Sequence, residues 1–163
     1  MDKTLSVENL VSLFDLQPHP EGGYYKETYR AEGTLNTPRG NRNHATAIYY
    51  LLTEGTQSRL HRLKQQDEIM HFYLGDPLTL VEILPDGKIE NTILGQDVLS
   101  GQKLQHVIKA GHWFALYPNP GSRFGLIGCT VSPGFEFDDF EMDKKTELLQ
   151  KFPHAKDIIE KLA

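Results

Sequence analysis

Apolar and polar residues alternate in short runs along most of the chain, and this pattern predicts β-strands. The apolar runs are rich in β-branched and aromatic residues and are separated by turn residues. A period of two is typical of strands that bury one face. Strands are expected over residues 24–30, 45–53, 57–63, 68–74, 78–84, 88–94, 104–110, 112–118 and 123–132. So many short strands at nearly regular spacing indicate an antiparallel barrel or sandwich, a mainly β fold.

Short helices are predicted at both ends of the chain. Residues 7–14 have apolar side chains at helical spacing, with Thr4 or Ser6 available as the N-cap. Residues 143–152 and 154–163 are also helical in pattern, with a break at Pro153, and should pack on the outside of the barrel. The polar segment 31–44 is rich in Gly, Pro and Asn and is predicted to be a surface loop.

Length and composition indicate one globular domain over residues 1–163. Hydrophobic residues make up 39% and charged residues 24%, which is ordinary for a protein with a packed core. The formal charge of -5 and the lack of basic runs argue against nucleic acid and membrane partners. The first residues do not resemble a leader, so a cytoplasmic location is expected. The single cysteine, Cys129, lies in an apolar run and is interpreted as a core residue.

The candidate chemistry lies between Gly55 and Gly75. This stretch places His61, Glu68 and His71 on two strands joined by a polar turn. Imidazole and carboxylate groups on buried strands cost free energy unless they bind a metal, a partner or a ligand. Strand parity groups Arg59 with His61 on one face, and it puts His71 on the face opposite to Glu68, where it could enter a subunit interface.

The same stretch resembles the first motif of the cupin superfamily. The motif is G-x5-H-x-H-x3-4-E-x6-G, and Gly55, His61, Glu68 and Gly75 fall at its spacing, while Leu63 stands where it has its second histidine. The second motif, G-x5-P-x-G-x2-H-x3-N, is faint. Its inner glycine is Gly111, its proline is Lys109 and its histidine falls on Phe114.

Three longer segments look like the cupin subfamily described as predicted sugar epimerases. They are PHPEGGYYKETYR, DEIMHFYLGDPL and GCTVSPGFEFDDFE, and the resemblance runs from about Leu10 to Glu141. It implies a cupin-type double-stranded β-helix, or jelly-roll barrel, with its core at about residues 22–142, a pocket inside the barrel and a homodimer. The stretch Ser58-Arg59-Leu60-His61 is also similar to an Arg-x-Leu-His stretch of the metal-free cupin dTDP-4-dehydrorhamnose 3,5-epimerase.

These observations predict a metal-free isomerase or epimerase that acts on a carbohydrate-like or nucleotide-sugar small molecule. His61 has the ordinary pKa range of a general base, Glu68 would orient it or act with it, and Arg59 would bind an anion or polarise a carbonyl. A barrel tyrosine would supply the acid.

Further ligand contacts are predicted at four other residues of the barrel, namely Tyr50, Tyr73, His71 and His112. The remaining histidines are interpreted as solvated or capping groups; these are His19, His44, His106 and His154.

Two alternatives stay open at this point. A metal-dependent cupin enzyme would hold a divalent transition metal through His61 and Glu68, with His112 or His71 as a substitute ligand. Leu63 and Phe114 argue against it, because catalytic metal sites usually have about three protein ligands, and no cofactor is therefore predicted. The other alternative is a cupin that binds a small ligand without catalysis, because a fold does not fix a function.

Overall fold

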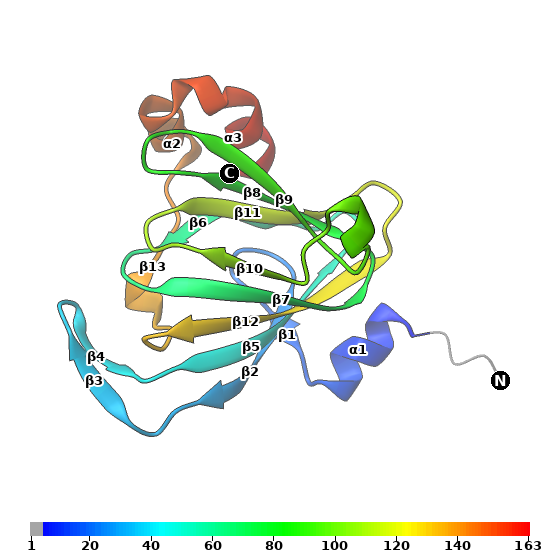
Figure 1. Ribbon diagram of the computed structural model, residues 1–163, viewed down its shortest axis with the longest axis horizontal. Coiled ribbons are helices and arrows are strands. Elements are labelled where there is room, and N and C mark those ends of the chain that lie inside the picture. Colours follow the sequence, from blue (N-terminus) through cyan, green and yellow to red (C-terminus); the bar gives the residue numbers. More distant parts are fainter. Residues whose placement is uncertain (1–4) are drawn as a thin grey trace.

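Two antiparallel sheets face each other in the computed structural model, which describes residues 5–163 (Figure 1). The helical elements are α1 (Val7–Leu13), η1 (Val98–Ser100), η2 (Phe137–Asp139), α2 (Lys145–Lys151), η3 (Pro153–Ala155) and α3 (Lys156–Leu162). The strands are β1 (Gln17–Pro18), β2 (Tyr24–Arg30), β3 (Thr34–Thr37), β4 (Gly40–Asn43), β5 (Thr46–Thr53), β6 (Ser58–Leu63), β7 (Asp67–Gly75), β8 (Leu78–Ile83), β9 (Ile89–Leu94), β10 (Gln105–Ile108), β11 (Trp113–Pro118), β12 (Phe124–Ser132) and β13 (Phe140–Glu141). The expected strands are all present, so the prediction of a mainly β fold is confirmed.

The strand order is that of a jelly roll. One sheet has the order β1-β2-β5-β12-β7-β10 and the other has the order β13-β6-β11-β8-β9. Strands that are neighbours in one sheet are mostly distant in sequence, so the chain crosses repeatedly between the two layers. The predicted cupin-type double-stranded β-helix is confirmed by this topology.

The main core lies between the two sheets and follows the period of two along each strand. On β8, Leu78 and Leu80 point inward and pack against Phe114 of β11 and Ile127 of β12. The alternate residues of the same strand face outward under the C-terminal helices. Side chains of equal parity therefore share one environment, and polar residues of inward parity must find partners inside the barrel.

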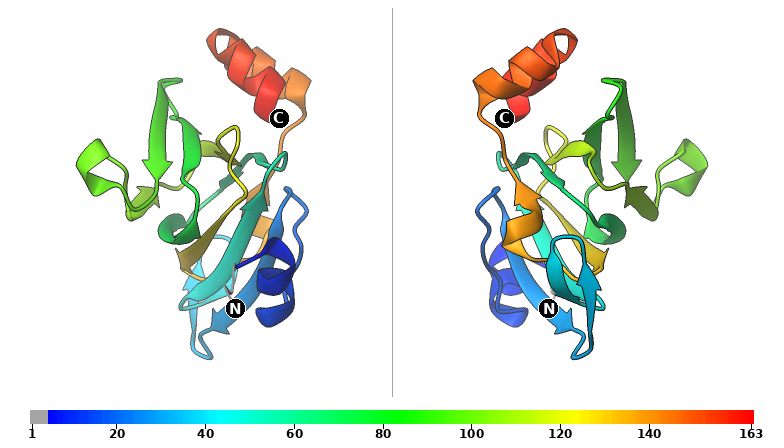
Figure 2. Two further views of the ribbon diagram at one scale, coloured as in Figure 1. Left: turned by 90° about the vertical axis from the view of Figure 1, so that its right-hand side faces the viewer. Right: turned by 90° about the vertical axis from the view of Figure 1, so that its left-hand side faces the viewer.

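The terminal helices pack on the outside of the sheets, as predicted. Residues of α2 and α3 cover the outer face of β11 and β8, where Trp113 is fully buried. Helix α1 packs through Leu10 on the other sheet, and Ser6 caps it; the alternative cap, Thr4, lies outside the described residues. Figure 2 shows the C-terminal helices and α1 at opposite ends of the molecule. No helix within residues 5–163 has the length and apolar character needed to cross a membrane.

The prediction of a loop over residues 31–44 is wrong, because this segment contains the β3–β4 hairpin (Figure 1). Its strands carry mainly polar residues, so no hydrophobic alternation marked them. The hairpin is attached to the barrel by Arg42, whose guanidinium donates to the buried carboxylate of Asp139 at 2.7 and 3.0 Å. Charged hydrogen bonds of this kind replace the apolar face that a strand normally buries.

Candidate active site

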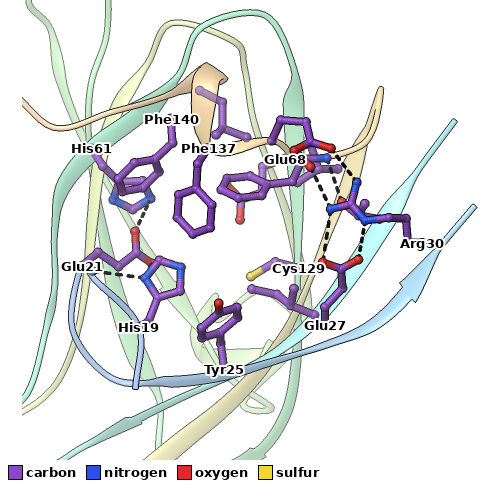
Figure 3. Close-up of a pocket in the computed structure, with 16 residues that line it drawn as sticks. His19, Glu21, Tyr25, Glu27, Arg30, His61, Glu68, Cys129, Phe137 and Phe140 are labelled. Atoms are coloured by element: carbon purple, nitrogen blue, oxygen red, sulfur yellow. Dashed lines mark hydrogen bonds and ion pairs between the residues drawn. The ribbon is translucent and has the colours of Figure 1, made fainter. Parts of the chain in front are cut away.

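A cavity opens between the two sheets at the end of the barrel where the segment after β12 crosses over it. Its volume is about 100 Å³, several times the roughly 10–15 Å³ that one water molecule needs. The lining residues come from β2, β5, β6, β7, β12, β13, η2 and two loops, and they are His19, Glu21, Tyr25, Glu27, Arg30, Thr46, Ile48, His61, Leu63, Glu68, Cys129, Val131, Phe135, Glu136, Phe137 and Phe140. Figure 3 shows His61, Glu21 and His19 on one side and Arg30 with Glu27 on the other.

Glu21 is held in a tight turn between β1 and β2. The carbonyl of Glu21 accepts from the Arg59 N–H at 3.0 Å, and the Tyr50 hydroxyl donates to the carbonyl of Gly22. Gly22 has φ +111°, and a Cβ there would lie 2.1 Å from the Gln57 carbonyl oxygen, so only glycine fits. The main chain therefore fixes where the Glu21 carboxylate enters the cavity.

His61 and Glu21 form a buried ion pair. His61 Nδ1–H donates to the Arg59 carbonyl at 2.7 Å, and His61 Nε2 lies 2.9 Å from Glu21 Oε2. Within residues 5–163, Oε2 has no aligned hydrogen bond, so the short contact is electrostatic. Burial alone would lower the pKa of His61, but the Glu21 charge and the polar contacts outweigh burial, and the pKa is raised. Burial opposes ionisation of Glu21 too, yet His61 holds the pKa of that carboxyl below its usual value.

Glu68 lines the same cavity from β7. Its side chain is buried, and burial, with a smaller contribution from the Glu21 charge, raises its pKa to about 7 against the attraction of His61. Cys129 of the adjacent strand β12 lies beside it, and burial raises the pKa of that thiol well above its ordinary value. Glu68 is therefore a carboxyl group that is present in both protonation states near neutral pH.

His19 is a buried, neutral member of the cavity wall. The Glu21 N–H donates to His19 Nδ1 at 3.1 Å, so the ring proton resides on Nε2. The 3.7 Å separation between Nδ1 and Glu21 Oε1 is thus not a hydrogen bond. Burial lowers the pKa of His19, and the nearby His61 charge adds to this effect. The interpretation of His19 as a solvated or capping group is wrong, because only 7% of its side chain is exposed.

Aromatic rings cover the cavity. Phe135, Phe137 and Phe140 pack edge to face, with ring centroids 5.0–6.3 Å apart. His61 lies between Phe140, at 5.2 Å, and Phe114, at 4.0 Å. The segment 135–140, which we term the cover segment, encloses the ion pair and limits its contact with water.

The prediction that the Arg59 and His61 side chains lie on the same face of β6 is wrong. The register between β6 and β11 shifts between the pairs Phe114–His61 and Leu116–Ser58. This irregularity turns the Arg59 side chain to the surface, where it donates to the Pro20 carbonyl at 3.0 Å. Only the main chain of Arg59 contributes to the site, through its contacts with His61 and Glu21.

The four predicted ligand contacts do not line the cavity. Tyr50 is buried beneath the Glu21 turn, where it supports Gly22. His71 and Tyr73 lie on the outer face of their sheet, with Tyr73 41% exposed and His71 hydrogen-bonded to Thr130. His112 lies 3.0 Å from Glu82, in a separate cluster.

That second cluster also contains His106, whose interpretation as a solvated or capping group is wrong. His106 Nε2 lies 2.6 Å from Glu82 Oε2, while His112 Nδ1 faces Glu82 Oε1. Burial opposes ionisation of Glu82, but the two histidine contacts prevail and lower the pKa of its carboxyl.

The prediction that His61 and Glu68 face the barrel interior together is correct, since both line the cavity. Most of the other lining residues were not predicted from the sequence. The strongest available signal was Glu21, a carboxylate between a proline and a pair of glycines in an aromatic run. The aromatic residues at alternate positions of GFEFDDF were a second signal for a hydrophobic cover. Neither signal says which distant residues meet, because that depends on pairing across the barrel.

The residues of the cavity do not fit a metal ion. Leu63 and Phe114, at two positions where the cupin motifs have histidine, are apolar here, and both nitrogens of His61 already face acceptors. In the part of the chain that the structure describes, no group of three His, Cys, Asp or Glu side chains has the arrangement to hold a metal. The expectation that no cofactor is needed remains a prediction.

The fold and the cavity define a cupin barrel, and comparison with known proteins gives its family. Residues 8–143 match the family described as Cupin superfamily (DUF985), so the chain belongs to the cupin superfamily. An uncharacterized protein of Saccharomyces cerevisiae is 33% identical in an alignment of 149 residues that covers 82% of this chain and 73% of that protein.

Solved structures agree with this assignment. A hypothetical protein from Leishmania major has a TM-score of 0.91 at 31% identity and covers 98% of this chain and 99% of its own. Protein SO0799 from Shewanella oneidensis has a TM-score of 0.91 at 35% identity and covers 98% of each chain. Oxalate decarboxylase from Bacillus subtilis, at 14% identity and a TM-score of 0.58 over 91% of this chain and 37% of its own, is similar in fold alone.

Proposed function

We propose that this cupin is an isomerase or epimerase that moves a proton on a small carbohydrate-like molecule bound in the cavity. The observation that supports the proposal is the convergence of a buried His61–Glu21 ion pair and a carboxyl group with a raised pKa, Glu68, in one enclosed space. Perturbed titratable groups in a closed cavity are typical of acid–base sites. The subfamily resemblance to predicted sugar epimerases supports the same chemistry.

His61 suits the role of proton donor better than the role of base predicted for it. Both ring nitrogens face oxygen atoms that only accept, namely the Arg59 carbonyl and the Glu21 carboxylate. An imidazole with two acceptors is stabilised as the cation. In this form Nε2–H, which is not aligned on Glu21, would donate to the oxygen of a substrate carbonyl placed along its direction and stabilise the negative charge that develops on that oxygen.

Glu68 is the base in this scheme. A carboxylate whose pKa is about 7 holds a proton more tightly than an ordinary one, and at neutral pH a large fraction of it is ionised and ready to accept. It would remove a proton from the carbon next to the substrate carbonyl, leaving an enolate held by His61. Return of a proton to the opposite face from the Tyr25 hydroxyl, which points into the cavity in Figure 3, would invert that carbon. Glu68 would then release its proton to water and Tyr25 would regain one from water, which restores the starting state.

Exchange of carbon-bound hydrogen with solvent tests the proposal. The protein would be incubated in D₂O with a panel of aldoses, ketoses and nucleotide-linked keto-sugars, and deuterium at carbon would be read by mass spectrometry. Wild-type protein should exchange the hydrogen next to the carbonyl of its substrate, and Glu68→Gln and His61→Gln should not. The exposed Glu54→Gln is the matched control. Saturable binding of a panel member without any exchange would instead indicate a binding protein.

A further inference from the structure

One carboxylate oxygen in the cavity has only a misaligned partner, because His61 Nε2 lies 2.9 Å from Glu21 Oε2 without pointing at it. The Glu21 side chain is 9% exposed, and its Oε2 atom is both buried and without an aligned donor anywhere in residues 5–163. A buried acceptor without a well-aligned donor costs free energy, and more when it is charged. A ligand that brings an N–H or O–H group to this position would remove that cost.

Among the residues that the structure describes, Arg30 is the only arginine in the cavity wall, and it has no donor left for an anion. A guanidinium carries five N–H groups. Arg30 directs them to Glu27 through Nε and Nη2, to Asn43 and Glu136 through Nη1, and to the Phe135 carbonyl through Nη2. Figure 3 shows Arg30 beside Glu27, with dashed lines for the contacts between them. A phosphate or carboxylate of a ligand would have to displace one of these contacts.

The charges around the cavity are unfavourable for an anion as well. Within residues 5–163, the cationic side chains in the cavity wall are Arg30 and His61, and each is already paired with a carboxylate. The same wall contains four glutamates, which are Glu21, Glu27, Glu68 and Glu136. Inside a poorly solvated space such charges act more strongly than in water. A negative ligand would meet net repulsion, and a positive one would meet net attraction.

Aromatic faces supply a second feature that favours a cation. Tyr25 and the rings of the cover segment line the same space as the glutamates. Aromatic rings attract ammonium groups through their electron-rich faces, and rings combined with carboxylates form the usual cage for such ligands. The cavity volume of about 100 Å³ also lies below the roughly 300–1,000 Å³ of pockets that enclose drug-sized molecules, so the cavity is too small to enclose a whole nucleotide sugar.

We infer that the substrate of this cavity is a small molecule without negative charge, and that an ammonium group on the substrate strengthens binding. This inference rests on the isomerase function proposed above. The chemical class is an amino-sugar-like polyol, in which an ammonium donates to Glu21 and lies against the rings. Nucleotide sugars and sugar phosphates are excluded from this class.

A matched set of three probes tests the inference by direct binding. Glucosamine, glucose and glucose 6-phosphate differ in charge on a common ring, and their binding would be followed by protein NMR. Glucosamine should bind about tenfold more tightly than glucose, which corresponds to about 1.4 kcal/mol of cation–π and ionic attraction, and glucose 6-phosphate should not bind. Glucose 6-phosphate binding as tight as that of glucose would overturn the inference, and so would a failure of glucosamine to saturate the protein.

A gain-of-function variant makes the test sharper. Glu27→Gln combined with Glu136→Gln removes the two anionic partners of Arg30. This variant should acquire affinity for glucose 6-phosphate. The control is Glu32→Gln, at an exposed glutamate that does not line the cavity, and it should behave like wild type. If a folded double variant still does not bind glucose 6-phosphate, the saturation of Arg30 by its carboxylate partners is not the cause of the selectivity against anions.

These outcomes separate the inference from the proposed function. Binding of glucosamine without any exchange of carbon-bound hydrogen would contradict the isomerase and leave the ligand class intact. Exchange on a nucleotide keto-sugar would support the isomerase and overturn the ligand class.

Discussion

The barrel contains two clusters of histidine and glutamate, and they differ in one respect that separates a site from a structural contact. In the first, His61 Nε2 lies 2.9 Å from Glu21 Oε2 but is not aligned on it, and both side chains line the cavity. In the second, both oxygens of Glu82 contact a histidine, one on β10 and one just before β11. Buried polar groups are normally satisfied. A buried group that is not satisfied therefore indicates where a ligand is expected, and residue type alone does not.

The largest difference between the clusters should appear in catalysis. Glu21→Gln should lower turnover of the substrate found by deuterium exchange about 10²-fold or more, because His61 loses the charge that keeps it protonated. Glu82→Gln should lower turnover no more than a few-fold. Equal losses in steady-state rate for the two variants would contradict the distinction.

An NMR titration separates this effect from simple damage to the fold. In the Glu21→Gln variant, burial of His61 is opposed only by the weaker effects of Glu68 and the Arg59 carbonyl, so the pKa of His61 should fall below its wild-type value. Glu82→Gln should leave the His61 titration where it is in wild type.

The two buried carboxyl groups Glu68 and Glu82 should change stability in opposite directions with pH. Glu68 has a pKa of about 7 when folded and 4.5 in the unfolded chain, so between these pH values only the folded state holds the proton. The free energy of unfolding should therefore fall as pH rises from 4.5 to above 7, by about 3 kcal/mol at about 1.4 kcal/mol per pH unit. Glu68→Gln should be more stable than wild type by up to this amount at pH 8 and equal to it at pH 4, as measured by urea unfolding.

Glu82 gives the opposite and somewhat smaller effect. Its folded pKa lies below the unfolded value, so its contribution is present above pH 4.5 and is lost as pH falls through the folded pKa. Glu82→Gln should lower the free energy of unfolding at pH 7 by about 1–3 kcal/mol, because two histidine contacts lose their charged acceptor. Urea midpoints should converge with those of wild type in acid; a constant difference at all pH values would contradict the assignment.

The smallest effect is expected at Arg59. Its side chain lies at the surface, so Arg59→Ala should change stability by no more than about 0.5 kcal/mol and leave glucosamine binding unchanged. A marked loss of binding in an NMR titration would show that the side chain enters the cavity after all.

The sequence predicted the sheets well because hydrophobic alternation is a local signal. The β3–β4 hairpin was missed because Arg42 and Asp139, far apart along the chain, attach it through charge. The position of Arg59 was wrong because a register shift interrupts the parity of β6. His61 and Glu68 were found from their spacing, but Glu21 joins them only through the pairing of its turn with the Arg59 main chain. Such long-range contacts leave no periodic trace in a sequence.

The Glu21 turn makes the charge inside the barrel independent of the residues that build the two sheets. The turn is fixed by main-chain contacts and by Gly22, and its anchors are Tyr50 and the backbone of Arg59. A carboxylate can therefore be added to or removed from the barrel interior by one substitution in a turn, with no change to either sheet. The turn between β1 and β2 can therefore set the charge inside the barrel while the strands hold its walls.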